Sequence, residues 1–316
     1  MSSATFDPDA PVLSYSPVTF QIPGRPVSLQ VRVTAPAAGG NLPVILLSHG
    51  HGASNNLSSL NGYAPLVNQW AAAGFVVIQP THLSSRTLAA KLSDAPGAPF
   101  FWQSRATDMS HILDHLGEIE NEVPQLAGRL HRDNVAVSGH SLGGFTAGLL
   151  LGATVTDPDT GEVVSFLEPR IKQGVLLAAP GRGGEDVLTG WMAAQVPFFH
   201  GIDFSTMTTP ALVVAGDKDD SQHFTSVGPD WHADPYRLAP APKALLTVFG
   251  AEHLLGGISG YDAQETSDEN PERVAAVARL SAAYLHSQFR PGSLTWEAAC
   301  AELAAGTAPL AGVESK

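Results

Sequence analysis

Short apolar runs alternate along this chain with longer segments in which apolar residues recur every three or four positions. The short runs are rich in Val, Ile and Leu and predict buried strands near residues 17–22, 28–34, 43–48, 75–79, 134–138, 174–178, 211–215 and 244–249. The longer segments predict helices near residues 61–73, 103–119, 141–152 and 271–289. The last of these begins with Asn270 as a cap and Pro271 at the first helical position.

This order of elements predicts an α/β fold. Strands that alternate with helices favour a mostly parallel sheet, here of eight strands, with helices on both faces. The first two strands are separated by the turn-forming residues 23–26, so we expect an antiparallel hairpin at the sheet edge. We expect one domain over residues 1–316, with a core at about 17–290 and a C-terminal helical tail at 291–316, because the motifs below are spread along the whole length.

Residues 139–143, Gly-His-Ser-Leu-Gly, fit the pattern G-x-S-x-G between a predicted strand and a predicted helix. A sharp turn from strand to helix needs glycines where side chains would clash, and it exposes the serine hydroxyl at the carboxyl edge of the sheet. Ser141 is therefore the candidate nucleophile. The N–H of Leu142 lies at the start of the helix, where it can bind a developing oxyanion.

A serine hydroxyl needs a general base, and the base needs an acid to orient it. In one known chain order the serine is followed by the acid and then by the histidine, each just after a strand. The strand at 211–215 runs into three candidates, Asp217, Asp219 and Asp220; we favour Asp219 as the acid. The strand at 244–249 leads to His253, the predicted base.

The remaining histidines have other interpretations. The strand at 43–48 ends in a His-Gly loop, where the N–H of His51 is expected to complete the oxyanion hole. His49 with His51, and His111 with His115, have spacings that could bind a metal, but the first pair lacks a third ligand nearby. The second pair lies opposite the apolar stripe of its helix, so a solvated face is favoured. We expect His140 to be a packed neighbour of Ser141 and not a second base.

Taken together, these motifs resemble the α/β-hydrolase superfamily, in the branch of platelet-activating-factor acetylhydrolases, chlorophyllases and cutinase-like polyester hydrolases. The resemblance extends over about residues 17–290 and includes the His-Gly loop, the serine motif, Gly216–Asp219 and His253. It implies a serine esterase of this fold. We expect no large cap domain, because the insertions described below are too short for one, and no cofactor, because the triad needs no metal or other group. Leu142 follows the serine here, whereas plant chlorophyllases usually have a basic residue at that place.

Three insertions, at residues 83–102, 181–208 and 221–242, exceed ordinary connections, and long loops at the carboxyl edge are where specificity is built. The third contains Trp231, His232 and Tyr236. Part of the aromatic content should pin the loops, and part should line an apolar acyl or aryl pocket over Ser141. The predicted pocket residues are Phe100, Phe101, Trp102, Trp191, Met192, Phe198 and Phe199.

Composition restricts the partners. Lys and Arg total 17 and Asp and Glu total 30, a net charge of −13, which argues against nucleic acid or an anionic membrane as partner. The single cysteine, Cys300, cannot form an intrachain disulfide and lies in a predicted short helix as a small apolar residue. The chain begins without a recognisable signal peptide, so we expect a cytoplasmic location, although a processed form would look the same. No apolar stretch is long enough to span a membrane.

The sequence thus predicts a serine hydrolase that cleaves small-molecule carboxylic esters with Ser141, His253 and Asp219. Amide, lactone or thioester hydrolysis and metal-free perhydrolysis remain alternatives on the same triad, because the triad does not encode the leaving group. A non-catalytic relative that binds a small apolar ligand is a more distant alternative.

Overall fold

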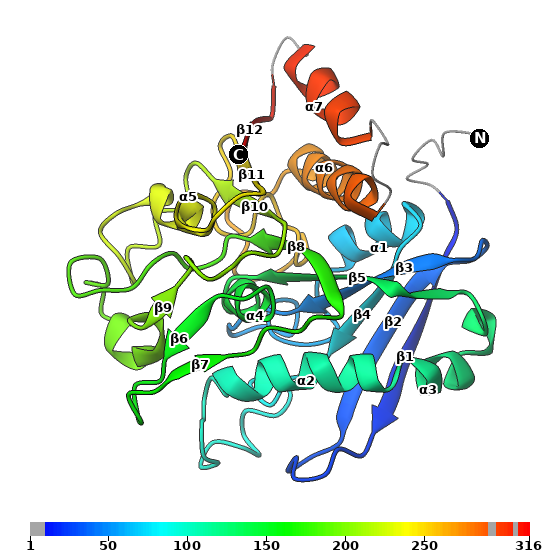
Figure 1. The fold of residues 1–316 in the computed structure, drawn as a ribbon, viewed down its shortest axis with the longest axis horizontal. Coiled ribbons are helices and arrows are strands. Elements are labelled where there is room, and N and C mark those ends of the chain that lie inside the picture. Colours follow the sequence, from blue (N-terminus) through cyan, green and yellow to red (C-terminus); the bar gives the residue numbers. More distant parts are fainter. Residues whose placement is uncertain (1–9, 290–294, 306–308) are drawn as a thin grey trace.

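The computed structural model describes residues 10–289, 295–305 and 309–316. A mostly parallel sheet of nine strands forms its centre, in the order β1-β2-β4-β3-β5-β8-β10-β11-β12 (Figure 1). The strands are β1 (Val12–Phe20), β2 (Leu29–Pro36), β3 (Leu42–Ser48), β4 (Val76–Pro80), β5 (Leu130–His140), β8 (Ile171–Leu177), β10 (Ala211–Gly216), β11 (Lys243–Val248) and β12 (Ala311–Ser315). The pairings from β4 to β11 are parallel, and the antiparallel pairings are confined to the two sides of the sheet.

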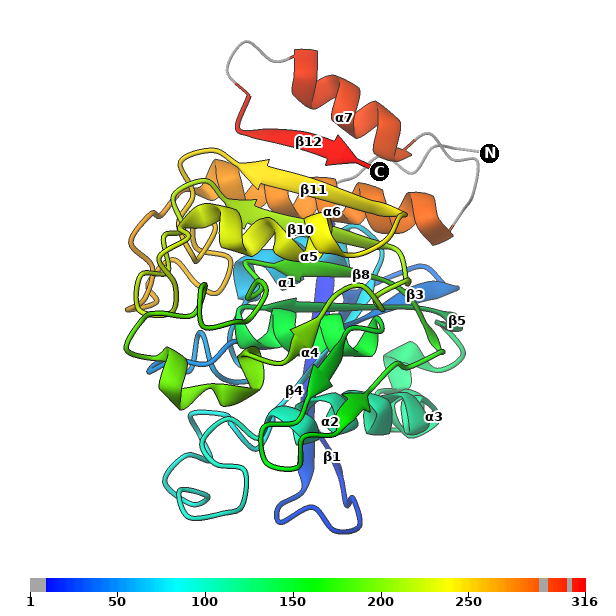
Figure 2. The same ribbon diagram turned by 60° about the vertical axis from the view of Figure 1, so that its left-hand side comes forward.

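Helices cover both faces of this sheet, as Figure 2 shows from the side. The α1 (Ala64–Ala72), α6 (Pro271–Phe289) and α7 (Thr295–Ala305) helices contribute to one apolar core, and α2 (Trp102–Asp114), α3 (Leu116–Glu122) and α4 (Leu142–Leu150) contribute to the other. The β3 strand shows why both cores form: Val44 and Leu46 belong to one and Ile45 and Leu47 to the other. Successive side chains of a strand point to opposite faces, so a continuous apolar run serves both layers.

A second sheet of three short strands lies outside the large one. It consists of β6 (Thr154–Thr156), β7 (Val163–Ser165) and β9 (Ile202–Asp203), in the order β7-β6-β9. The other short elements are α5 (Asp234–Leu238) and the 3₁₀ turns η1 (Pro124–Leu126), η2 (Ala193–Gln195), η3 (Pro197–Phe199) and η4 (Pro229–Ala233). Because α5 is the longest helix described between β8 and β11, this part of the chain builds loops around the sheet edge and not a helical layer over it.

The α/β architecture and the antiparallel hairpin at the edge agree with the sequence prediction, but the strand count does not. The sheet has nine strands because β12 pairs antiparallel with β11. Ala244 lies opposite Ser315 at one end of this pairing, and Val248 lies opposite Ala311 at the other. The predicted helical tail is therefore wrong for residues 311–315, whereas α7 contains the helix expected around Cys300. The β1 strand also begins five residues earlier than predicted. The register shifts between Tyr15 and Val18, so the parts of β1 before and after this irregularity both pair with β2.

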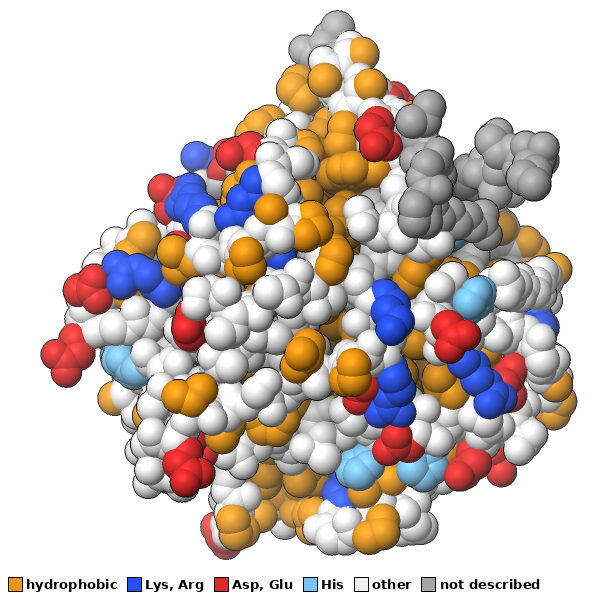
Figure 3. Space-filling model, viewed as in Figure 1, with side chains coloured by type: hydrophobic (Ala, Val, Ile, Leu, Met, Phe, Trp, Pro, Cys, Tyr) orange, Lys and Arg blue, Asp and Glu red, His pale blue; other side chains and the backbone are white. Residues whose placement is uncertain are grey.

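The surface mixes the two signs of charge. On the face in Figure 3, Lys and Arg side chains lie beside Asp and Glu side chains. Among the described ion pairs, Arg237 contacts Asp230 at 2.7 Å, with the two side chains 46% and 72% exposed. Exposed pairs of this kind contribute about 0–1 kcal/mol each to stability. Within the described residues, no helix is both long and apolar enough to cross a membrane.

Candidate active site

Ser141 lies at the turn between β5 and α4, where the sequence motif predicts it. Its backbone has φ 55° and ψ −120°, a conformation that side-chain-bearing residues rarely adopt. Its N–H donates to the carbonyl of Leu177 at 2.9 Å, and its carbonyl accepts the N–H of Phe145 at 3.1 Å. The hydrogen bonds on both sides hold the strained turn in place at the carboxyl end of β5.

Glycine is required on both sides of Ser141. A Cβ at Gly139 would lie 1.9 Å from the carbonyl oxygen of Gly143, and a Cβ at Gly143 would lie 2.0 Å from the carbonyl oxygen of Ser48. Both contacts are far inside van der Waals distance and involve backbone atoms that cannot move aside. Gly143 therefore allows the start of α4 to pack directly against the end of β3, and Gly139 allows it to lie against the end of β5. Leu142 is the first residue of α4, and N–H groups at this position have no partner within the helix.

Asp219 and His253 come together from the loops after β10 and β11. The Nδ1 of His253 lies 2.7 Å from the Oδ2 of Asp219, and Asp219 is almost fully buried. The neighbouring aspartates lie elsewhere: Asp217 accepts the N–H of Gly250 at 2.6 Å, and Asp220 is exposed and is reached by the side chain of Gln222 at 3.3 Å. Of the three candidates in this loop, only Asp219 is hydrogen-bonded to His253 among the described contacts.

The charges of these two groups stabilise each other. Burial alone would raise the pKa of Asp219, but the neighbouring His253 and His232 outweigh it and hold this pKa well below its usual range. Burial opposes protonation of His253, yet the charge and the hydrogen bond of Asp219 prevail and raise the pKa of His253 above 6.5. The imidazole thus binds a proton more readily than a free histidine does, which suits a general base.

The loop after β3 lies beside Ser141. No hydrogen bond from the N–H of His51 is found within the described part of the chain. The side chain of His51 packs against Phe100 with ring centroids 4.9 Å apart, and its Nδ1 is buried without a hydrogen-bond partner. Burial lowers the pKa of His51 to about 4, so its imidazole is neutral near pH 7. No hydrogen bond from the N–H of Leu142 is found among the described residues either.

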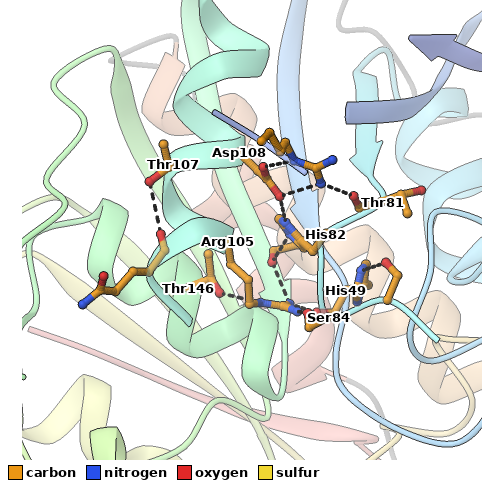
Figure 4. A network of polar contacts seen from close by, with 12 residues as sticks. His49, Thr81, His82, Ser84, Arg105, Thr107, Asp108 and Thr146 are labelled. Atoms are coloured by element: carbon orange, nitrogen blue, oxygen red, sulfur yellow. Dashed lines mark hydrogen bonds and ion pairs between the residues drawn. The ribbon is translucent and has the colours of Figure 1, made fainter. Parts of the chain in front are cut away.

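A buried arginine forms hydrogen bonds with the residues at the start of this loop. Arg105, on α2, is completely buried and donates to the hydroxyls of Thr146 at 3.1 Å and Ser48 at 3.1 Å, and to the carbonyl of His49 (Figure 4). It also donates to the hydroxyl of Ser84. Burial lowers the pKa of Arg105 to about 9, which still leaves it charged at neutral pH. One guanidinium group therefore ties the strand end before His51 to α2 and α4.

A second layer of polar contacts completes the network. His82 lies between Asp108, with Nδ1 2.9 Å from Oδ2, and the hydroxyl of Ser48, 3.0 Å from Nε2 (Figure 4). Arg25 donates to the other oxygen of Asp108 at 2.8 Å. The Nε2 of His49 lies 2.8 Å from the hydroxyl of Ser85. No local sequence motif indicates this network, because its members come from five separate segments: Arg25, residues 48–49, 82–85 and 105–108, and Thr146.

Ser141, Asp219 and His253 all line a cavity of about 640 Å³. Of the predicted pocket residues, the cavity is lined by Phe100, Trp191, Met192 and Phe199. The cavity is also lined by residues that were not predicted from the sequence, among them Leu57, Val196, Phe224, Trp231 and Leu254. The lining is mostly apolar, with polar groups concentrated around Asp219, His253 and the rim at Glu252 and Glu265.

Three predicted pocket residues are placed elsewhere, and the prediction is wrong for them. Phe101 packs with Leu83 and Leu92 in a separate small cluster under the loop after β4. Trp102 stacks on Phe198 with ring centroids 5.7 Å apart, and both contact Phe145 of α4. These aromatic side chains fix the insertions to the body of the protein instead of facing the cavity.

The groups that could by their type hold a metal are mostly engaged with protein atoms. The ring nitrogens of His49 contact Gly50 and Ser85. His111 and His115 lie on the partly exposed face of α2, where His115 donates from Nδ1 to the carbonyl of His111 at 2.7 Å. Asp219, His232 and His253 form the one cluster of three such residues found among the described residues, and in it Oδ2 of Asp219 contacts both histidines, at 2.7 Å and 3.1 Å.

Comparison with known proteins adds no family to this description. No protein-family model and no curated protein matches the chain.

Proposed function

We propose that the protein is a serine hydrolase of the α/β-hydrolase type that cleaves carboxylic esters through an acyl-enzyme. The observation that carries the proposal is the 2.7 Å contact between Asp219 and His253 in the same cavity as Ser141, which lies at a strained strand-to-helix turn. Each of the three groups follows a different parallel strand, so the sheet fixes their relative positions.

In the proposed reaction, His253 takes the proton of Ser141 while the serine oxygen attacks the acyl carbon. The N–H groups of His51 and Leu142 stabilise the oxyanion, and Asp219 orients His253 and stabilises its cation. His253 then gives the proton to the leaving alcohol. Water repeats the sequence with the acyl-enzyme and releases the carboxylic acid.

The cavity favours an apolar acyl or aryl group. Phe100, Met192, Phe199 and Trp191 border the space next to Ser141, and apolar and aromatic linings are typical of small-molecule sites. A lining of this kind favours a neutral ester over a charged one, because charged groups lose hydration on entry. The proposed resemblance to the branch of platelet-activating-factor acetylhydrolases, chlorophyllases and cutinase-like polyester hydrolases rests on the His-Gly loop, the serine motif, Gly216–Asp219 and His253, and not on the pocket residues.

A fluorophosphonate probe tests the proposal directly. The expected result is covalent labelling of the folded protein at Ser141, with no labelling of Ser141→Ala at equal thermal stability. A panel of p-nitrophenyl esters of increasing acyl length then tests ester cleavage. Ser141→Ala should lower kcat by roughly 10⁴- to 10⁶-fold. An unlabelled wild-type protein that hydrolyses no ester of the panel would refute the proposal.

A further inference from the structure

Asp219 has a second histidine partner. His232, in η4, places its Nε2 3.1 Å from the Oδ2 of Asp219, the same oxygen that contacts His253. His232 and Asp219 are 1% and 2% exposed at their side chains, so water does not compete for this contact. The hydroxyl of Ser221 lies 2.9 Å from the Oδ1 of Asp219 and 2.9 Å from the Nε2 of His232.

The positions of the hydrogen atoms follow from these contacts. The Nδ1 of His232 lies 2.9 Å from the carbonyl oxygen of Ala179, which can only accept, so Nδ1 carries a hydrogen. A neutral ring would then direct the lone pair of Nε2 at the hydroxyl of Ser221 and place it 3.1 Å from the carboxylate oxygen of Asp219. It would also take the only hydrogen of Ser221, leaving Oδ1 of Asp219 without this donor. A ring protonated at both nitrogens removes both conflicts. Its Nε2–H donates to the oxygen of Ser221, the hydroxyl of Ser221 donates to Oδ1 of Asp219, and the positive ring lies 3.1 Å from Oδ2.

We propose that His232 is a positioning residue that carries a proton on both ring nitrogens. In this form it holds Asp219 in place, and its positive charge weakens the attraction between Asp219 and a protonated His253. This inference rests on the proposed function. The ring centroids of His232 and His253 are 5.6 Å apart, a distance at which a positive charge on one disfavours a proton on the other. When His232 is charged, His253 loses its proton at a lower pH than it would if Asp219 were its only charged neighbour. His253 can therefore act as a base at that lower pH.

The other histidines around the pair do not supply this charge. His140 and His223 are the remaining histidines close to His232, and burial lowers the pKa of both, so they are neutral near pH 7. Asp268 acts on His253 with a negative charge and favours its proton, in the same sense as Asp219. Among these neighbours, His232 is therefore the group that can oppose Asp219.

The protonation state of His232 can be measured without any catalytic assay. The ring ¹⁵N chemical shifts of histidine-labelled protein are recorded near pH 7, and His232→Gln identifies the signals by their loss. The expected result is that both nitrogens of His232 have the shifts of protonated nitrogens. A shift typical of an unprotonated Nε2 would overturn the proposal, and this result stands even if the protein proves not to be a hydrolase.

The effect on the base is measured by the pH dependence of fluorophosphonate labelling, which needs no knowledge of the natural substrate. His232→Gln retains a neutral donor, so the midpoint of the labelling rate should move to higher pH, with a loss of about tenfold or less on the plateau. Ser221→Ala removes a neutral donor from the same carboxylate and should shift the midpoint less. His115→Gln, at a remote histidine that also donates to a main-chain carbonyl, should leave the profile unchanged.

An unchanged or lower midpoint in His232→Gln, or an equal shift in Ser221→Ala, would overturn the role of the charge. Failure of the proposed function has a different signature, since the wild-type protein would then not be labelled at any pH. Thermal melting of each variant shows whether it is folded, and His232→Asn replaces His232→Gln in both measurements if the glutamine variant is not.

Discussion

His140 donates a hydrogen bond from Nε2 to the main-chain carbonyl of His253, at a distance of 2.8 Å. Its Nδ1 lies 3.0 Å from the hydroxyl of Tyr63, which in turn accepts the N–H of Gly50 at 2.9 Å. Burial lowers the pKa of His140 to about 3, so the ring is neutral and its Nε2–H is fixed on the carbonyl. The residue before Ser141 thus connects the proposed nucleophile to the backbone of the proposed base.

Removing this contact should disturb catalysis without removing any reacting group. We expect His140→Ala to lower kcat for p-nitrophenyl acetate by about 10- to 100-fold, because His253 loses the contact that sets its distance from Ser141. The orphaned groups should also reduce the free energy of unfolding, measured in urea, by about 1–3 kcal/mol. His140→Gln keeps a donor near the same place and should recover part of the activity. Wild-type kcat in the folded alanine variant would show that the contact does not position His253.

The acid assignment can be tested within one loop. Asp219→Asn should lower kcat on the order of 10⁴-fold, because an amide in place of the carboxylate favours the wrong tautomer of His253. Single-turnover and steady-state assays with p-nitrophenyl esters measure the loss.

Asp217 and Asp220 serve as matched controls for that variant. Asp217→Asn removes charge from a side chain that accepts the N–H of Gly250, and Asp220→Asn changes an exposed side chain. Both should retain kcat within about tenfold of wild type. Collapse of activity in Asp217→Asn, with near-normal turnover in Asp219→Asn, would transfer the role of the acid to Asp217.

The proposed base predicts the direction of the pH dependence. His253 acts only without its proton, so activity should rise with pH and be lost as the pH falls through the pKa of His253. Because Asp219 raises that pKa, the midpoint of kcat/KM should lie above 6.5, the value for an unperturbed histidine. Measurement of kcat/KM from pH 5 to pH 9 with a neutral ester checks this. A midpoint clearly below 6.5 would contradict the electrostatic picture of the site.

Much of the fold could be predicted because its strands are long apolar runs buried on both faces. All seven residues of β3 and all five of β4 are buried, and such runs stand out in any sequence. The β12 strand could not be recognised in the sequence, because the segment 311–315 is short and partly exposed. It gains its strand conformation by pairing with β11. The three-residue strands β6 and β7 depend on each other in the same way.

The residues of the candidate site could likewise be predicted only in part. Ser141, Asp219 and His253 follow strands in an order that the sequence displays, and the structure brings Asp219 and His253 into contact. The pocket was harder to predict because neighbours in an irregular loop face different ways: Phe100 lines the cavity, whereas the next residue, Phe101, packs into a separate cluster. Alternation and helical periodicity apply only to regular elements, so no pattern separates such neighbours.

The network around Arg105 leads to a prediction about stability. Replacing this fully buried guanidinium by methionine would leave the hydroxyls of Ser48, Ser84 and Thr146 and the carbonyl of His49 without their donor. We expect Arg105→Met to lower the free energy of unfolding by about 3–5 kcal/mol, measured by urea denaturation. Arg237→Met is the matched control, because Arg237 and its partner Asp230 are 46% and 72% exposed and their ion pair should contribute about 0–1 kcal/mol. Equal losses in the two variants would mean that the network adds little.

Trp191 offers the sharpest test of substrate specificity. Its side chain is 75% exposed although it borders the cavity that contains Ser141. The backbone on either side is fixed to the neighbouring insertion, since Gly190 donates to the carbonyl of Phe224 at 3.0 Å and Met192 to that of His223 at 2.9 Å. An exposed indole on a fixed backbone contributes little to packing, so its surface remains available for a substrate.

Trp191→Ala should therefore change specificity and leave stability almost unchanged. For a bulky acyl or aryl ester, kcat/KM should fall by an amount equal to about 1–3 kcal/mol of transition-state binding, with a much smaller loss for an acetyl ester. Leu167→Ala, at another exposed apolar side chain that is not among the cavity-lining residues, should alter neither value. Assays of both variants on the two esters, together with thermal melts, measure these effects. An equal loss on both esters, or only a lower Tm, would assign Trp191 to holding the loop, and the acyl group would then have to bind against Phe100 and Phe199 instead.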